Sequence, residues 1–148
     1  MSYGDTKQLF SVQSTSKPVS YCIALECLGP EKVHNHVGHE PSGVEFNAIT
    51  LNSDGKPHNP LINAGAIMVC SLIKPEEEES ARFSYVMDIW RNLAGGQMIT
   101  YDNTVFLSER NTADTNYALA HLMKSKDAFP DGVDIKKTLE FYFQCCSL

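Results

Sequence analysis

A nearly continuous apolar segment, residues 61–73, limits the folds that this chain can adopt. Its sequence, LINAGAIMVCSLI, places apolar side chains on almost every side of a helix, and such a helix is buried on most sides. Asn59 and Pro60 come directly before it, and an asparagine N-cap followed by proline is typical of a helix start. The sequence therefore predicts a central helix that begins at Asn59-Pro60 and is covered by other elements.

A second helix is expected over residues 18–28. Its apolar residues recur at helical spacing, and Gly29-Pro30 follows them. A glycine followed by a proline is typical of a helix C-terminus. The apolar positions of this segment are Val19, Cys22, Ile23 and Leu28.

Two amphipathic helices are expected in the second half of the chain. Ser80 is the predicted N-cap of the first, which ends at Gly95-Gly96. Asp134 is the predicted N-cap of the second, which runs to the end of the sequence. Their apolar stripes are Phe83, Val86, Met87, Trp90 and Leu93 in the first, and Leu139, Tyr142, Phe143 and Cys146 in the second.

The length and composition predict one globular domain, the helical patterns above make it mainly α, and the composition excludes several classes of protein. The 148 residues are 43% hydrophobic and 20% charged, and the net charge of −6 owes much to the acidic run 76–79. No basic stripe is present, so no nucleic-acid partner is expected. No run reaches the roughly 18–20 apolar residues of a membrane span, so no membrane partner is expected. The five cysteines match no zinc-site spacing and predict buried thiols in a reducing compartment.

Ser14 and Lys17 stand three residues apart at the front of the second expected helix. On a helix this spacing brings the two side chains to one face, with Cβ atoms about 5–6 Å apart. A serine becomes a nucleophile when a base removes its proton, and a lysine serves as that base when desolvation lowers its pKa. The same spacing recurs at Ser53 and Lys56 and at Ser71 and Lys74. Spacing alone therefore leaves a catalytic pair and a chance pair both open.

Three histidines, His34, His36 and His39, lie close together in the sequence. Their spacing fits neither one face of a helix nor one face of a strand, and Gly38 lies among them. We interpret them as solvated or structural histidines and expect no metal site.

Three polar residues within the helical patterns are further candidates. Asn63 lies in the apolar segment, either as a core asparagine that bridges helices or as an amide aimed into a pocket. Glu109 and Asn116 are seven residues apart, two turns of one expected helix, and so share a face. They form either a solvated helix start or a site for an ammonium and a polar head group.

Several motifs occur along the chain in a characteristic order. Together they closely resemble the serine-dependent glutaminases, of the animal type, and the resemblance covers essentially the whole chain. The motifs are QSxxKP from Gln13, EPSG from Glu40, PHNP from Pro57, NAGAI from Asn63, SER from Ser108, DxN from Asp114, DxFP from Asp127 and FYFQ from Phe141.

The resemblance implies a fold and a reaction. The fold would be the helical subdomain of an α+β protein similar to serine β-lactamases and DD-peptidases. Residues 1–148 would form part of the catalytic domain, with its upstream and downstream sheet portions lying outside them. Ser14 would attack the side-chain amide of L-glutamine, Lys17 would assist its deprotonation, and ammonia and then glutamate would be released without a cofactor. The positions that match substrate-binding residues of the family are Gln13, Asn63, Glu109, Asn116 and Tyr142.

Partners and alternatives also follow from the resemblance. L-glutamine would be the substrate, and homo-oligomers would form through the loop at 43–51 and the helix at 109–124. Mitochondrial localisation is implied, with the cytoplasm as the alternative. A second hypothesis is a non-catalytic glutaminase fragment or isoform that associates with full-length subunits. A third, an acylating serine protein related to β-lactamases or peptidases, accounts only for the pair of Ser14 and Lys17.

Overall fold

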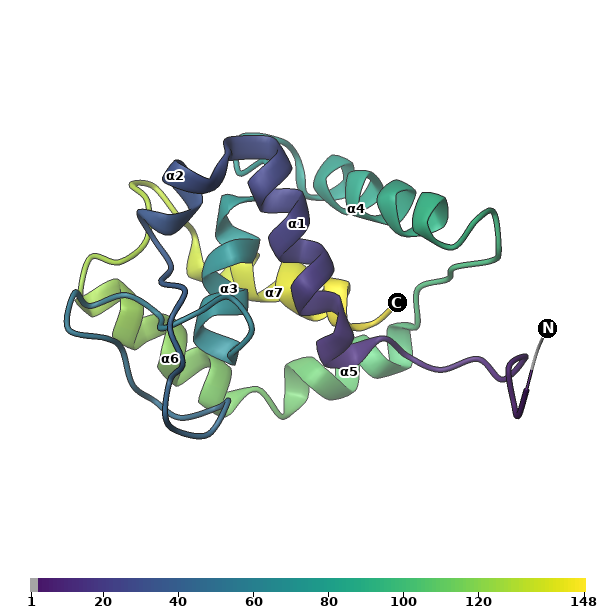
Figure 1. Cartoon of the computed structure of the whole chain (residues 1–148), viewed down its shortest axis with the longest axis horizontal. Helices are drawn as coiled ribbons and strands as arrows, with labels where there is room; N and C mark the ends of the chain where they lie inside the picture. Colours follow the sequence, from purple (N-terminus) through teal and green to yellow (C-terminus); the bar gives the residue numbers. More distant parts are fainter. Residues whose placement is uncertain (1–2) are drawn as a thin grey trace.

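The computed structural model describes residues 3–148, which form only helices and connecting loops (Figure 1). This confirms the mainly α expectation. The elements in order are η1 (Gln13–Thr15), α1 (Ser16–Leu28), α2 (Pro30–His34), α3 (Asn63–Leu72), α4 (Glu79–Leu93), α5 (Asn103–Asn111), α6 (Asp114–Ser125) and α7 (Ile135–Cys146).

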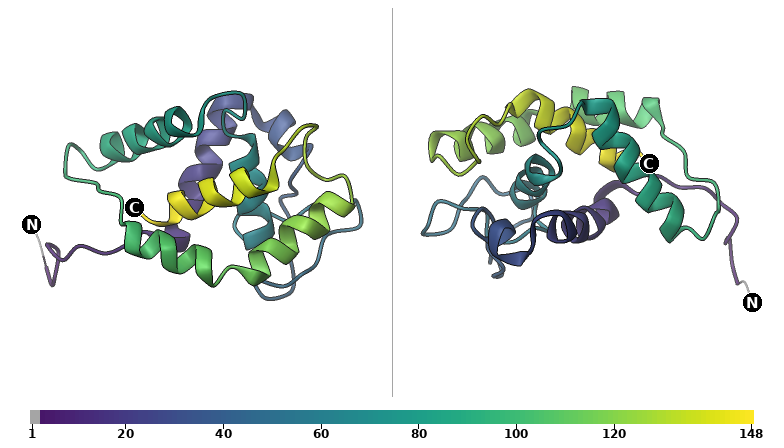
Figure 2. Two further views of the ribbon diagram at one scale, coloured as in Figure 1. Left: turned by 180° about the vertical axis from the view of Figure 1, so that it is seen from behind. Right: turned by 90° about the horizontal axis from the view of Figure 1, so that it is seen from above.

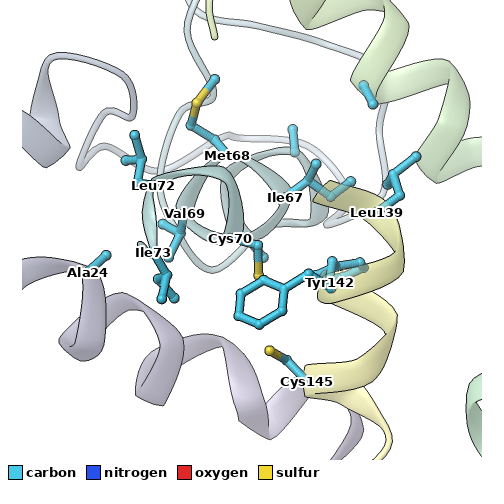
Figure 3. Close-up of a cluster of buried hydrophobic side chains, with 14 of the residues drawn as sticks. Ala24, Ile67, Met68, Val69, Cys70, Leu72, Ile73, Leu139, Tyr142 and Cys145 are labelled. Atoms are coloured by element: carbon cyan, nitrogen blue, oxygen red, sulfur yellow. The ribbon is translucent and has the colours of Figure 1, made fainter. Parts of the chain in front are cut away.

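Helix α3 is the centre of the core. It packs against α1 on one side and against α6 and α7 on the other (Figure 2). Every residue from Ala64 to Leu72 is buried, and the side chains of α3 meet those of α1 and α7 in one apolar cluster (Figure 3). The prediction of a helix buried on most sides is confirmed.

The predicted start of α3 is wrong by about one turn. The helix begins at Asn63, and Asn59 instead closes a turn in front of it. Its side-chain oxygen accepts from the backbone N–H groups of Leu61, at 3.0 Å, and Ile62, at 3.2 Å. The asparagine thus makes a capping type of bond, but the bond stabilises the turn that leads into the helix.

Gly65 allows this turn to lie directly on α3. A Cβ atom at Gly65 would be 1.8 Å from the carbonyl oxygen of Asn59 and 2.9 Å from Cα of Pro60. Both neighbours are backbone atoms, so the contact cannot be relieved by a side-chain rotation.

The predicted boundaries of α1 and α4 are only partly right. Gly29 ends α1 with a φ of 78°, as predicted, but Pro30 then opens the short helix α2. Helix α4 begins at Glu79 with Glu78 as N-cap, so Ser80 is not the cap. Leu93, predicted as part of the buried stripe, is 65% exposed.

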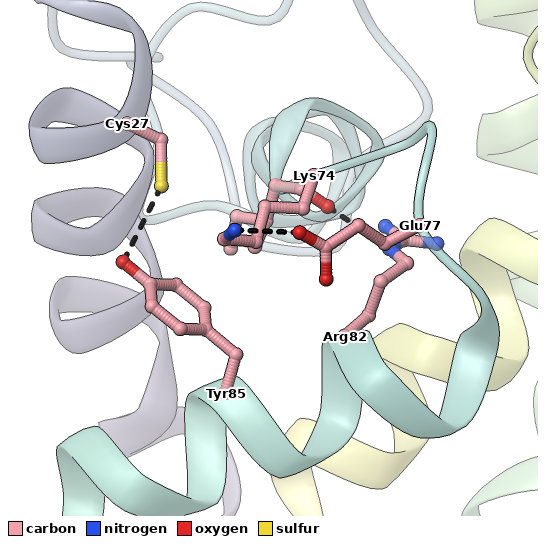
Figure 4. Close-up of polar contacts among 6 residues, drawn as sticks. Cys27, Lys74, Glu77, Arg82 and Tyr85 are labelled. Atoms are coloured by element: carbon pink, nitrogen blue, oxygen red, sulfur yellow. Dashed lines mark hydrogen bonds and ion pairs between the residues drawn. The ribbon is translucent and has the colours of Figure 1, made fainter.

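Arg82 connects α4 to the end of α3 (Figure 4). Its buried guanidinium donates to the carbonyl oxygens of Ile73, at 2.9 Å, and Cys70, at 2.8 Å. These carbonyls belong to the C-terminal end of α3, where a positive charge is favourable. Arg82 was not identified from the sequence, because it occupies a polar position in an otherwise ordinary amphipathic pattern.

The segment 109–124 is not one helix. The chain leaves the helical conformation at Thr112 and Ala113, so α5 and α6 are separate helices. The expectation that Glu109 and Asn116 share a helical face is therefore wrong. By contrast, α7 is as predicted: Asp134 accepts from the backbone N–H of Lys137 at 3.1 Å, and its apolar stripe is buried.

Replacing Gly65 with alanine tests the close approach of the turn to α3. Because the new methyl group would overlap backbone atoms, we expect Gly65→Ala to lower the free energy of unfolding by about 3 kcal/mol, despite the better helix propensity of alanine. Urea unfolding measures this change. Ser84→Ala, at an exposed position of α4, is the control and should change stability by less than about 0.5 kcal/mol. Equal stability of Gly65→Ala and the parent chain would contradict the packing.

Candidate active site

Ser14 lies in the short helix η1, directly in front of α1. This agrees with the predicted position of the Ser14 and Lys17 pair at the start of a helix. Gln13 has a φ of 46°, a left-handed conformation that is rare for a residue with a side chain and costs free energy. Both Gln13 and Ser14 are exposed. The strained turn therefore presents the serine to solvent.

Lys17 lies in the first turn of α1 and is only 4% exposed. Its Nζ donates to Oδ1 of Asn63 at 2.7 Å. The Asn63 Nδ2 in turn donates to Oδ1 of Asn116 at 3.1 Å. The structure thus joins three of the predicted site residues, from α1, α3 and α6, in one chain of hydrogen bonds.

The surroundings of Lys17 weaken its hold on a proton. Burial lowers the pKa of the Lys17 amine, and the negative charge of Glu109 opposes this shift only in part. Cys146 adds little negative charge near neutral pH, because burial raises the pKa of its thiol to about 12. Lys17 can therefore lose its proton at a lower pH than an exposed lysine, as a general base requires.

Tyr142 lies on α7, where its side chain is buried. Burial raises the pKa of the phenol, and the thiol of Cys146 and the carboxylate of Glu109 add to this shift. Tyr142 is therefore a neutral hydroxyl that can donate a hydrogen bond. Although Glu109 comes from α5, its charge acts on both Lys17 and Tyr142, so the tertiary fold brings it near the site.

Ser14 and Gln13 are not part of this hydrogen-bond network. No hydrogen bond joins the Ser14 hydroxyl to the Lys17 amine in the part of the chain that the structure describes. Gln13 makes no side-chain hydrogen bond within residues 3–148 either. The polar network thus consists of Lys17, Asn63 and Asn116, and the Ser14 side chain is not hydrogen-bonded to it in the described residues.

Two residues beside the site were missed by the sequence analysis. The Lys17 Nζ lies 5.6 Å from the centre of the Phe46 ring, and the Phe46 carbonyl accepts from the Asn63 backbone N–H at 2.9 Å. Phe46 belongs to a loop with no periodicity, so no pattern indicated this contact. Cys146, predicted only as a core position, also contacts the hydroxyl of Ser16.

The three histidines make structural contacts. His34 bonds to the hydroxyl of Tyr21 at 2.9 Å and to the carbonyl of Val37 at 3.0 Å. His36 bonds to the carbonyl of Ala128 at 3.1 Å, and the ring of His39 packs edge-on against His34. Across residues 3–148, no group of His, Cys, Asp and Glu side chains is arranged to hold a metal ion, and no helix is long and apolar enough to cross a membrane.

The burial of Lys17 predicts a change of stability with pH. Because its pKa is lower in the folded chain than in the unfolded chain, the unfolded state binds more protons between these two pKa values. The contribution of Lys17 to the free energy of unfolding should therefore be complete above pH 10.5 and be lost as the pH falls through the lowered pKa.

Urea unfolding of the parent chain and of Lys17→Met between pH 7 and about 10.5 measures this contribution. We expect the stability of the parent relative to Lys17→Met to rise with pH. Lys124→Met, at an exposed position of α6, corrects for the general effect of removing a lysine. If the difference in the free energy of unfolding between the parent and Lys17→Met stays constant or falls as the pH rises, the result would contradict the burial of the amine.

Comparison with known proteins shows the family. The Glutaminase family model matches residues 1–148. A Caenorhabditis elegans sequence named as a glutaminase is 48% identical over 146 residues, and the mitochondrial liver isoform of rat glutaminase is 44% identical over 147 residues. The crystal structure of a Bacillus glutaminase is 34% identical, with a TM-score of 0.83 over 93% of this chain.

The relatives are longer than this chain. The matched region is 99% of this chain but 25% of the C. elegans sequence and 24% of the rat sequence. It covers 46% of the Bacillus structure. Because both sequence and structure agree over nearly all of its length, the chain belongs to the glutaminase family.

Proposed function

We propose that this chain carries the catalytic centre for the hydrolysis of L-glutamine to L-glutamate and ammonia. The observation that supports this most directly is the buried Lys17, held by Asn63, in the first turn of the helix that follows the exposed and strained Ser14 turn. A desolvated amine and an accessible hydroxyl in this order are what serine acylation requires.

In the proposed reaction the Ser14 Oγ attacks the carbon of the side-chain amide while Lys17 takes the hydroxyl proton. The tetrahedral intermediate collapses, the proton passes to the leaving nitrogen, and ammonia departs. The resulting glutamyl ester at Ser14 is then cleaved by water, which releases glutamate and restores the hydroxyl. The side-chain amide of Asn63 orients the Lys17 amine, because its Oδ1 accepts a hydrogen bond from the Lys17 Nζ at 2.7 Å.

The remaining predicted site residues would bind the substrate. Glu109 carries the negative charge that an α-ammonium group needs, and its field already reaches Lys17 and Tyr142. Tyr142, Asn63 and Asn116 offer neutral donors for a carboxylate or an amide. Gln13 lies in the turn that holds Ser14, where its side chain is exposed.

We also infer that the helices are the helical subdomain of an α+β catalytic domain of the serine β-lactamase type, and that residues 1–148 are part of that domain. The match to the Bacillus structure supports this, because it covers 93% of this chain and 46% of that structure. The exposed apolar side chains Leu9 and Phe10, beside the Ser14 turn, are also consistent with a surface that another part of a larger protein covers.

Homo-oligomerisation and a mitochondrial location belong to the same proposal. Val44, Phe46 and Ile49 of the loop 43–51 are at least half exposed, which favours a contact surface at this loop together with the neighbouring α6. The rat relative is named as a mitochondrial protein. Fractionation of cells that express the intact protein would test the location.

Replacing Ser14 tests the reaction. Ammonia and glutamate release from L-glutamine is measured for the purified chain, with its mass by size exclusion recorded on the same sample. Because Ser14→Ala removes the nucleophile from an exposed turn, it should abolish turnover and leave the fold nearly unchanged. Ser53→Ala, the exposed serine three residues before Lys56, is the matched control and should keep full activity.

The outcomes of this assay separate the candidate functions. Turnover retained by Ser14→Ala would overturn the assignment of the nucleophile. A folded parent chain that releases no ammonia would overturn hydrolysis by this chain and favour the non-catalytic role in association with longer subunits.

Replacing Glu109 tests the ammonium site. Because the neutral amide of Glu109→Gln keeps the shape but loses the charge, the KM for L-glutamine should rise by about tenfold or more, as expected for losing a charge-assisted hydrogen bond. Steady-state kinetics measure this, with Glu140→Gln on α7 as a control of equal charge change. An unchanged KM would remove Glu109 from the substrate site.

A further inference from the structure

The last turn of α7, together with Leu148 after it, contacts the chain on both sides of the strained Gln13 and Ser14 turn. Before the turn, the Ser11 hydroxyl donates to the carbonyl of Cys146 at 3.1 Å, and the Val12 N–H donates to the carbonyl of Leu148 at 2.8 Å. After the turn, the Ser16 hydroxyl lies 3.6 Å from the Cys146 sulfur. Cys146 is therefore the residue that reaches both flanks.

We propose that Cys146 is a positioning residue that holds Ser14 in place for attack on the substrate. This inference rests on the proposed function and adds to it a residue that acts through Ser11 and Ser16 on the nucleophile.

We call these contacts of Cys146 with Ser11 and Ser16 the clamp. The conformation of Gln13 is the physical reason why the turn needs such a restraint. A residue with a side chain and a φ of 46° keeps that conformation only where its surroundings hold it. Ser14 itself is exposed, so packing around its own side chain does not supply the restraint. The contacts to α7 add a restraint to the local hydrogen bond from the Thr15 N–H to the Val12 carbonyl, at 2.9 Å, because Cys146 is 3% exposed and is fixed in the core of the helix bundle.

The thiol suits this role because it stays neutral. The Cys146 and Ser16 side chains are buried together, and a neutral S–H can donate to the hydroxyl or accept from it. Ser16 directly precedes Lys17. The same contact therefore fixes the start of α1, from which the Lys17 amine reaches Asn63.

Cys145 offers a matched control on the same turn. Cys145 is 1% exposed and belongs to the same buried cluster as Cys70 of α3 (Figure 3). Cys145→Ala and Cys146→Ala thus each remove one buried sulfur atom, from neighbouring positions. Only Cys146→Ala removes a contact with the Ser14 region, the contact with Ser16. A role in core packing alone predicts equal effects from the two changes.

The experiment compares kcat and KM for L-glutamine with amide hydrogen exchange over residues 10–17. Because a small displacement of a nucleophile slows attack more than it weakens substrate binding, Cys146→Ala should lower kcat about tenfold and change KM less than about twofold. Exchange over residues 10–17 should become faster. Cys146→Ser, which keeps a donor and acceptor, should recover most of the kcat, and Cys145→Ala should leave kcat within about twofold of the parent.

A second variant, Ser11→Ala, changes no residue of the core. Ser11 is half-buried, and Ser11→Ala removes only the hydroxyl that bonds to the Cys146 carbonyl. It should lower kcat and speed exchange in the same direction, so the proposal stays testable if Cys146→Ala does not fold.

Each outcome decides the proposal. Equal losses of kcat in Cys145→Ala and Cys146→Ala, or a change in KM with kcat unchanged, would overturn it. If the parent chain releases no ammonia, the proposed function of this chain fails separately, and the exchange measurement still decides the clamp. Unchanged exchange over residues 10–17 in both Cys146→Ala and Ser11→Ala would then overturn it.

Discussion

The burial of α3 on nearly all sides is the constraint on which the rest of the structure depends. Because α1, α6 and α7 must all cover this helix, the residues at its N-terminus come close to residues of the helices around it. Asn63 is the first residue of α3 and bonds to Lys17 of α1 and to Asn116 of α6. The polar site is thus a direct consequence of how the apolar core is assembled.

The same packing sets the chemistry of Lys17. An exposed lysine holds its proton near neutral pH, but this amine is buried in the first turn of α1 with a neutral amide as its hydrogen-bond acceptor. Burial thus turns an ordinary side chain into a candidate base, at a cost in stability that the surrounding apolar contacts offset.

Local patterns predicted the elements whose ends depend on nearby residues. Gly29 ends α1 and Asp134 caps α7, as expected, because these signals act within one turn of the chain. The start of α3 and the break between α5 and α6 were missed. Asn59 has the side chain of a cap, but it bonds within the turn that leads into α3. The segment at Thr112 and Ala113 contains no glycine or proline that would indicate an interruption.

The sequence by itself determined the helical content, the buried central segment and, through the order of its motifs, the glutaminase family. Only the tertiary structure decided which side chains meet. Lys17, Asn63 and Asn116 are far apart in the chain and come together because their helices share one core. Phe46 and Cys146 join the site from a loop and from a core stripe. Periodicity describes the face of one helix, and it carries no information about which residue of another element that face will touch.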